Sequence, residues 1–213
     1  TAKLAGIAYI LAVVLGVVVG VVAAVNHGKW VDSVLMTISV FGISAPAFWI
    51  AIILQIVICL KFNLLPLSGI DSFKSFILPG IALGTRYAAS IARITRTSML
   101  DVLSQDYIRT AEAKGLKGWV VTIKHALRNA LIPIITIAGS DLGNILTGSV
   151  LVESVFSIPG IGKMLVDSIN TRDLPIVQGG VMYIAVICVI MYLVVDLLYT
   201  VVDPRIRLGK ESS

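Results

Sequence analysis

Two charged side chains stand inside long apolar stretches of this 213-residue chain, at Arg86 and Asp141. A charge among apolar neighbours is costly, and it normally faces water or a partner of opposite sign. Asp141 lies in a stretch rich in glycine, serine, asparagine and threonine between residues 139 and 149. We therefore expect Ser140, Asp141 and Asn144 to line a water-filled path, with Arg86 as a further candidate. The alternatives are a salt bridge between Asp141 and Arg86, or a position of Arg86 at the edge of its apolar stretch.

Sequence patterns of common catalytic and metal sites do not occur in the chain. The run GIGK at residues 160–163 is similar to the end of a phosphate-binding loop. That motif needs a glycine where Ser157 stands and a serine or threonine where Met164 stands. The two histidines have no partners at metal-ligand spacing, and the two cysteines lie far apart in apolar runs. We predict no catalytic residue, no metal site and no cofactor bound by this chain.

The composition indicates a membrane protein. The chain is 57% hydrophobic and 14% charged, and its mean hydropathy is +0.97, whereas soluble domains are typically about 45–50% apolar and about 25% charged. In such a protein the net charge of +5 reflects orientation rather than nucleic-acid binding. About 20 apolar residues span a bilayer as a helix, so the sequence predicts an all-α, polytopic membrane protein. The five predicted spans are residues 4–25, 34–60, 77–100, 131–152 and 180–202.

Three features within and after these spans bear on packing. Gly16 and Gly20 form a small-xxx-small pattern that lets another helix approach closely. Pro46 stands inside the second span, where a proline removes a backbone hydrogen bond and usually kinks a helix. Residues 153–178 alternate apolar residues with proline and glycine, so this segment is too broken to span and too apolar for a free loop. We expect a re-entrant or interface-lying segment there.

The longest charged segment, residues 104–129, lies between the third and fourth predicted spans. It holds five of the 17 basic residues of the chain, and we interpret it as two short helices broken at Gly115. Cytoplasmic loops carry an excess of lysine and arginine, and three more basic residues follow the last span. This bias predicts that the segment and the C-terminus are cytoplasmic. The chain begins with Thr1 and has no basic leader, so we expect a further segment upstream. The three basic residues of the tail are Arg205, Arg207 and Lys210.

The run DYIRTAEAKGLKGWVVTIKHALRNALIP resembles the loop that carries the glutamate-alanine-alanine motif of ABC importer permeases. Ala111, Gly115 and Leu127 match that motif. The pattern DYIRTA-x-AKGL followed by HALRNAL-x-P is similar to one branch, the dipeptide/oligopeptide type, and within it to the first of the two permease subunits. Further segments resemble the same branch in order: LGVVVGVVAAVNHGKWVD, GISAPAFW, ARITRTSMLDVLSQDYIRTA, LTGSVLVESVFSIPGIGKML, INTRD and DPRIRL. The positions that depart from the general motif are Arg109, Thr110, His125 and Arg128.

The resemblance implies a type I ABC importer permease-like helix bundle. Residues 1–213 would form a single transmembrane permease domain that lacks the first span of the family. Such a subunit imports oligopeptides or dipeptides and is not itself an enzyme, because ATP and Mg are expected on a separate ATPase. The implied partners are a second homologous permease subunit, two cytoplasmic ATPase subunits, an extracellular or periplasmic peptide-binding protein, and membrane lipid. The implied location is the cell (inner) membrane of a bacterium or archaeon.

The resemblance also suggests roles for particular residues. Those expected to couple the chain to the ATPase are Tyr107, Arg109, Thr110, Ala111, Glu112, Lys114, Gly115 and Leu116. The apolar residues expected to pack the second half of this segment on the bundle are Trp119, Val120, Val121 and Ile123. Those expected to form part of an external gate are Glu153, Pro159, Gly160 and Gly162. Asp141 stands where a small or apolar residue is expected in this family.

Several alternatives stay open from the sequence. The same architecture could import nickel or another small solute. Charge alone would also fit a solvated loop at residues 104–129 that binds anionic lipid. A passive channel is a further alternative, because the fourth span is polar. The least favoured is an intramembrane enzyme that uses Asp141 together with Glu153 or Asp196.

Overall fold

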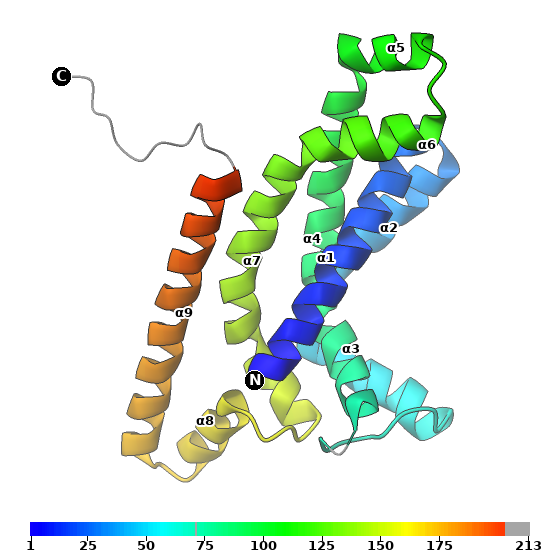
Figure 1. Ribbon diagram of the computed structural model, residues 1–213. Helices are drawn as coiled ribbons and strands as arrows, with labels where there is room; N and C mark the ends of the chain where they lie inside the picture. The colour runs from blue at the N-terminus through cyan, green and yellow to red at the C-terminus, as the bar shows by residue number, and fades with distance from the viewer. Residues whose placement is uncertain (71, 203–213) are drawn as a thin grey trace, which may run out of the picture.

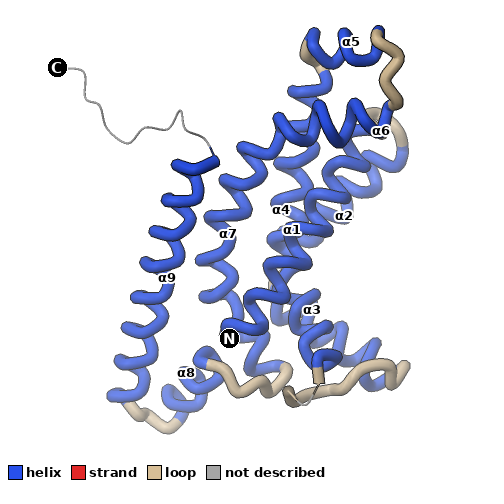
Figure 2. The backbone as a smooth tube through the Cα atoms, in the orientation of Figure 1, coloured by secondary structure: helices blue, strands red, loops and turns tan. Residues whose placement is uncertain are grey.

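The computed structural model describes residues 1–70 and 72–202, and within that part every regular element is a helix (Figure 2). This confirms the predicted all-α class. The elements in order are α1 (Ala2–Val25), α2 (Trp30–Ser44), α3 (Ala47–Leu54), the π-helix η1 (Gln55–Lys61), the 3-10 helix η2 (Phe73–Phe76), α4 (Ile77–Leu103), α5 (Asp106–Ala113), α6 (Gly118–Val120), the π-helix η3 (Val121–Leu127), α7 (Arg128–Val155), α8 (Ile161–Asn170) and α9 (Leu174–Val202). The basic tail residues Arg205, Arg207 and Lys210 and the side chain of Asp196 lie outside the described part.

Helix α4 is the centre of the bundle, because it packs against α1, α2, α3 and α7 (Figure 1). Its contact with α1 is very close. A Cβ added at Gly16 would lie 2.7 Å from Cβ of Ile91, and one at Gly20 would lie 2.6 Å from the carbonyl oxygen of Ala92. These distances are shorter than van der Waals contact, so a side chain at either position would force the helices apart. The predicted close approach at Gly16 and Gly20 is confirmed.

Several helices are long and apolar enough to cross a membrane. They are Ala2–Val25, Gly118–Val155 and Leu174–Val195, with the bent pair of α2 and α3–η1 as a fourth if it counts as one span. Helix α4 has 27 residues, but arginines such as Arg86 and Arg93 lower its hydropathy. Its polar groups are tolerated because it lies among other helices. The total of five spans stays a prediction.

The second predicted span, residues 34–60, is not one helix. Helix α2 ends at Ser44, α3 begins at Ala47, and the axis turns by 105° at the break. Ala45 and Pro46 both have extended backbone, with ψ of 130° and 137°. Proline has no N–H to donate, and it pushes the residue before it out of the helical region. The kink expected at Pro46 is therefore a full corner, and it stays a prediction that the two halves together form one span.

The segment 153–178 is more regular than its broken pattern indicates. Helix α7 continues to Val155, α8 follows, and α9 begins at Leu174 rather than at residue 180. Pro175 lies in the first turn of α9, where a missing N–H costs nothing. The Oδ1 atom of Asp173 accepts the N–H of Ile176 at 3.3 Å in the same turn. Pro159 and Gly160 thus mark the break before α8, whereas the break after α8, at residues 171–173, holds neither proline nor glycine. Helix α8 packs against α7 and α9.

Candidate functional site

The charged segment 104–129 folds as a knob at one end of the bundle (Figure 1). Helix α5 ends at Ala113, and the chain turns at Gly115, whose φ of +77° lies in the left-handed region that favours glycine. The N–H of Gly115 donates to the carbonyl oxygen of Glu112 at 2.8 Å, which closes the turn before α6 and η3. The predicted break at Gly115 is confirmed, but the second half is not a separate short helix, because α6, η3 and α7 run without a gap from Gly118 to Val155.

The inner face of the knob packs on the bundle through small and apolar side chains. They join the core cluster that also contains Met99 of α4. The two halves are tied together as well, because the hydroxyl of Tyr107 accepts a hydrogen bond from Nδ2 of Asn129 at 2.9 Å. The knob is therefore fixed to α4 and α7. Its buried side chains are Ile108, Ala111, Val121 and Ala126.

The outer face of the knob carries most of the residues expected to contact a partner. Ala111 is the exception, since it is only 7% exposed and faces the core. Its small side chain lets α5 lie close to the bundle, so it supports the contact surface without forming part of it. The exposed members of the predicted set are Tyr107, Arg109, Thr110, Glu112, Lys114, Gly115 and Leu116.

Trp119 and Ile123 do not pack on the bundle as predicted. They are 68% and 50% exposed, whereas Val121 between them is buried. The two side chains are four residues apart and share one helix face, and they border a cleft of about 580 Å³ that also includes Glu112 and Val25 of α1. An exposed tryptophan beside a cleft is typical of a protein contact surface. In the sequence, the i, i+4 spacing indicates that Trp119 and Ile123 share one helix face.

Arg86, Asp141 and Asn144 line one cavity of about 540 Å³ between α4 and α7. We call it the α4–α7 cavity. Three of the four residues predicted for a water-filled path are thus brought together. Ser140 does not line the cavity, and its hydroxyl donates to the carbonyl oxygen of Ile137 at 2.9 Å. The remaining wall residues are Ile43, Tyr87, Ser90, Thr147 and Gly148.

The two charges of the α4–α7 cavity are not paired with each other at contact distance. The ion pairs of the described residues do not include Arg86 with Asp141, so the expected salt bridge is not formed in this structure. The Oδ2 atom of Asp141 is buried and has no hydrogen-bond partner. The cavity is therefore lined by a positive side chain from α4 and a negative side chain from α7.

At the opposite end of the molecule from the knob, Glu153 holds the start of α8 (Figure 1). Its side chain is fully buried, and Oε2 accepts the N–H groups of Gly162 at 2.9 Å and Lys163 at 3.3 Å. A carboxylate is stabilised there by the free amide groups and the dipole of the helix N-terminus. A Cβ at Gly160 would collide with this carboxylate, and one at Gly162 would lie 2.8 Å from Oε2.

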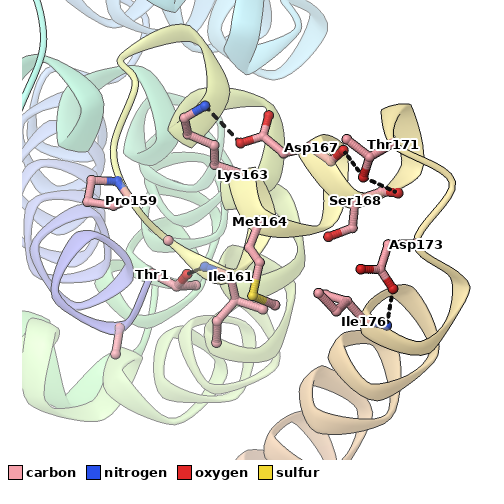
Figure 3. A pocket seen from close by; sticks show the side chains of 12 residues that line it. Thr1, Pro159, Ile161, Lys163, Met164, Asp167, Ser168, Thr171, Asp173 and Ile176 are labelled. Carbon is pink, nitrogen blue, oxygen red and sulfur yellow. Dashed lines mark hydrogen bonds and ion pairs between the residues drawn. The ribbon is translucent and has the colours of Figure 1, made fainter.

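The predicted gate residues thus form one corner between α7 and α8. Pro159 is exposed and borders a hollow of about 680 Å³ along α8 (Figure 3). Lys163 and Asp167 lie on the wall of the same hollow and pair at 3.1 Å. The geometry gives Glu153, Gly160 and Gly162 a structural part in this corner, and their role as a gate stays a prediction.

One buried ion pair was not predicted from the sequence. Asp32 at the start of α2 is 4% exposed, and it accepts hydrogen bonds from Nε and Nη2 of Arg96 at 2.6 and 2.7 Å. The Gly28 N–H donates to its Oδ2 at 3.2 Å, and Nδ1 of His27 lies 3.2 Å from the same oxygen. An acidic residue in the first turn of α2 was the available signal.

The helix bundle, with its polar cavity between α4 and α7, matches a known family of membrane proteins. The chain belongs to the family described as "Binding-protein-dependent transport system inner membrane component", which matches residues 16–208. It is thus a multi-pass membrane protein of a family of transporter permeases, which are not themselves enzymes. The resemblance to importer permeases is confirmed.

Individual relatives agree with the family. The chain is 45% identical over 198 residues to the "Glutathione transport system permease protein GsiC" of Escherichia coli (strain K12), and equally to those of Salmonella choleraesuis (strain SC-B67) and Shigella flexneri serotype 5b. The match covers 93% of this chain and 65% of each relative.

Among solved structures, the "Crystal structure of an amino acid ABC transporter with histidines" is similar, with a TM-score of 0.65 at 18% identity. That match covers 97% of this chain and 92% of that chain. At this identity the likeness shows a shared fold.

Proposed function

We propose that this chain is a permease subunit that forms part of the membrane path of an ATP-driven importer for oligopeptides or dipeptides. The family and the 45% identity to permeases named for glutathione transport support this proposal. The observation that carries it is the knob. Exposed polar residues around Gly115 form its outer face, while Ile108 and Val121 fix its inner face to the core that contains α4.

The proposal divides the work between subunits. Two cytoplasmic ATPase subunits would bind ATP and Mg and receive the knob in a surface cleft, with Tyr107, Arg109 and Trp119 as the contacts. Their closure would move α4 and α7 together, because the knob is tied to both. A second homologous permease subunit would complete the path, and alternating access would arise largely from rigid-body motion. An external peptide-binding protein would dock at the end that carries α8, in the cell (inner) membrane of a bacterium or archaeon.

The coupling role is tested by changing the knob in the complete transporter. Gly115→Pro imposes a φ near −65° where the native φ is +77°. Arg109→Glu reverses a charge on a side chain that is 76% exposed. We expect both variants to insert into the membrane, to copurify with less ATPase and to lose at least tenfold of ATP-dependent uptake. The matched charge reversal Lys74→Glu, on the exposed η2 at the other end, should keep the ATPase bound.

Other outcomes would select other functions. Unchanged peptide uptake by both knob variants would rule out the coupling role. ATP-driven accumulation of nickel in place of peptide would select the alternative solute on the same architecture. Flux that needs neither ATP nor an ATPase would indicate a passive channel.

A further inference from the structure

We infer that the α4–α7 cavity binds a zwitterionic peptide, with Asp141 as the partner of its ammonium group and Arg86 as the partner of its carboxylate. The inference rests on the proposed function and makes it more specific, because it places a charge-selective site on this chain. It begins from the two opposite charges that line one cavity, Arg86 from α4 and Asp141 from α7.

The first step is that neither charge forms an ion pair at contact distance among the described residues. Asn144 is a hydrogen-bond partner of the Asp141 carboxylate, and Arg86 acts on that carboxylate only from a distance. The Oδ2 atom of Asp141 is buried without a hydrogen bond. A buried charge without a close counter-charge is unfavourable among apolar helices. A ligand that carries one positive and one negative group would satisfy both side chains at once.

The second step is the depth of the cavity. Asp141 lies about 20 Å from either end of α7, at 1.5 Å per helical residue. This is near the middle of a helix that is long and apolar enough to cross a membrane. Asp141 is therefore too deep for its carboxylate to reach the membrane interface, or to pair there with a charge at the interface. A carboxylate at this depth marks a path or a binding site for a polar solute.

The third step is the rest of the wall. Tyr87, Ser90, Asn144 and Thr147 offer hydroxyl and amide groups, which can donate to or accept from the peptide groups of a ligand. The hydroxyl of Thr147 donates to the carbonyl oxygen of Gly143 at 3.3 Å, and its oxygen can still accept. A volume of about 540 Å³ lies within the range of about 300–1,000 Å³ that is usual for small-ligand sites.

The test uses the purified permease–ATPase complex in lipid nanodiscs, without the external binding protein. Calorimetric titration compares trialanine with N-acetyl-trialanine and with trialanine amide. Trialanine carries both charges, N-acetyl-trialanine lacks the ammonium group, and trialanine amide lacks the carboxylate. We expect wild-type complex to bind trialanine about tenfold or more tighter than either capped form, as a charged hydrogen bond requires.

Two variants separate the two charges. Asp141→Asn should weaken trialanine and its amide but leave N-acetyl-trialanine unchanged. Arg86→Gln should weaken trialanine and its N-acetyl form but leave the amide unchanged. The matched controls Asp101→Asn and Arg93→Gln change exposed charges on α4 outside the cavity, and both should bind all three probes as the wild type does.

Three results would overturn the inference. They are no trialanine binding by the wild-type complex, equal binding of the three peptides, or an equal loss of all three peptides in both variants. The wild-type comparison needs no substitution, so it decides even where a variant fails to assemble. If ATPase association and ATP-driven peptide uptake persist while charge selectivity is missing, the proposed function stands and this inference falls. If no ATPase associates with the chain, the proposed function itself fails.

Discussion

The carboxylate of Asp32 and the guanidinium of Arg96 form a two-point ion pair that joins the start of α2 to α4. The Nε–Oδ1 distance is 2.6 Å and the Nη2–Oδ2 distance is 2.7 Å. The pair is largely buried, with side-chain exposures of 6% for Asp32 and 23% for Arg96. It lies at the end of the bundle where the knob begins, because α4 leads into α5 only a few residues later. The ion pair therefore connects α2 to the part of α4 that leads into the knob.

Breaking this pair should destabilise the protein strongly. Asp32→Asn leaves the Arg96 guanidinium without its counter-charge, and the loss of one partner of a buried pair costs about 3–5 kcal/mol. Arg96→Lys keeps the charge but loses the two-point geometry, so we expect a smaller loss. Chemical unfolding of the detergent-purified protein, followed by circular dichroism, measures both changes.

Arg93→Lys serves as the control for this pair. It makes the same change on the same helix at an exposed position, where about 0.5 kcal/mol or less is expected. If Arg93→Lys and Arg96→Lys destabilise the protein equally, the ion pair has no special part in stability.

Helices α1 and α9 could be predicted from the sequence, because each carries its own evidence in a long apolar run. The turn at Gly115 could also be predicted, since glycine separates two short amphipathic segments. The Asp32–Arg96 pair could not, because 64 residues separate the partners and no local pattern connects them. The outward position of Trp119 does not follow from its hydrophobicity, because an aromatic side chain can lie in the core or on a surface that contacts a partner.

The α4–α7 cavity was likewise predictable only in part from the sequence. Ser90 lies four residues after Arg86, a helical spacing that puts both on one face of α4, and both line the α4–α7 cavity. Helical spacing also relates Asp141, Asn144 and Thr147, so one face of α7 was recognisable. The two faces meet across one cavity because α4 packs against α7. The spacing of residues within either helix carries no information on that packing.

Gly115 should tolerate asparagine better than valine. A Cβ at this position meets nothing within 4 Å, so the φ of +77° is the sole source of strain. Asparagine adopts this conformation more readily than a β-branched residue, for which the cost is about 1–2 kcal/mol or more. In membrane vesicles, trypsin should cleave after Lys114 faster in Gly115→Val than in Gly115→Asn. Equal cleavage of the two variants would mean that the left-handed turn is not needed.

Gly20→Ala should push α1 and α4 apart. The added Cβ would lie 2.6 Å from the carbonyl oxygen of Ala92, and overpacking of this kind costs about 1–3 kcal/mol. Gly6→Ala is the matched control on the same helix, because a Cβ there meets nothing within 4 Å. We expect the thermal midpoint in detergent to fall for Gly20→Ala and to stay or rise slightly for Gly6→Ala. The reverse order would contradict the observed packing of α1 on α4.

Glu153→Ala should loosen the start of α8, whereas Glu153→Gln should largely preserve it. Alanine leaves the N–H groups of Gly162 and Lys163 without their acceptor, at a cost of about 1–3 kcal/mol for each buried group. Glutamine keeps an oxygen acceptor and loses only the attraction of a negative charge to the helix N-terminus, about 0.3–1 kcal/mol. Hydrogen exchange at residues 158–168 should therefore rise much more in Glu153→Ala. Asp167→Asn, which changes an exposed carboxylate on α8, should leave exchange of the first α8 amides unchanged. Similar exchange in Glu153→Ala and the wild type would show that the carboxylate does not hold this corner.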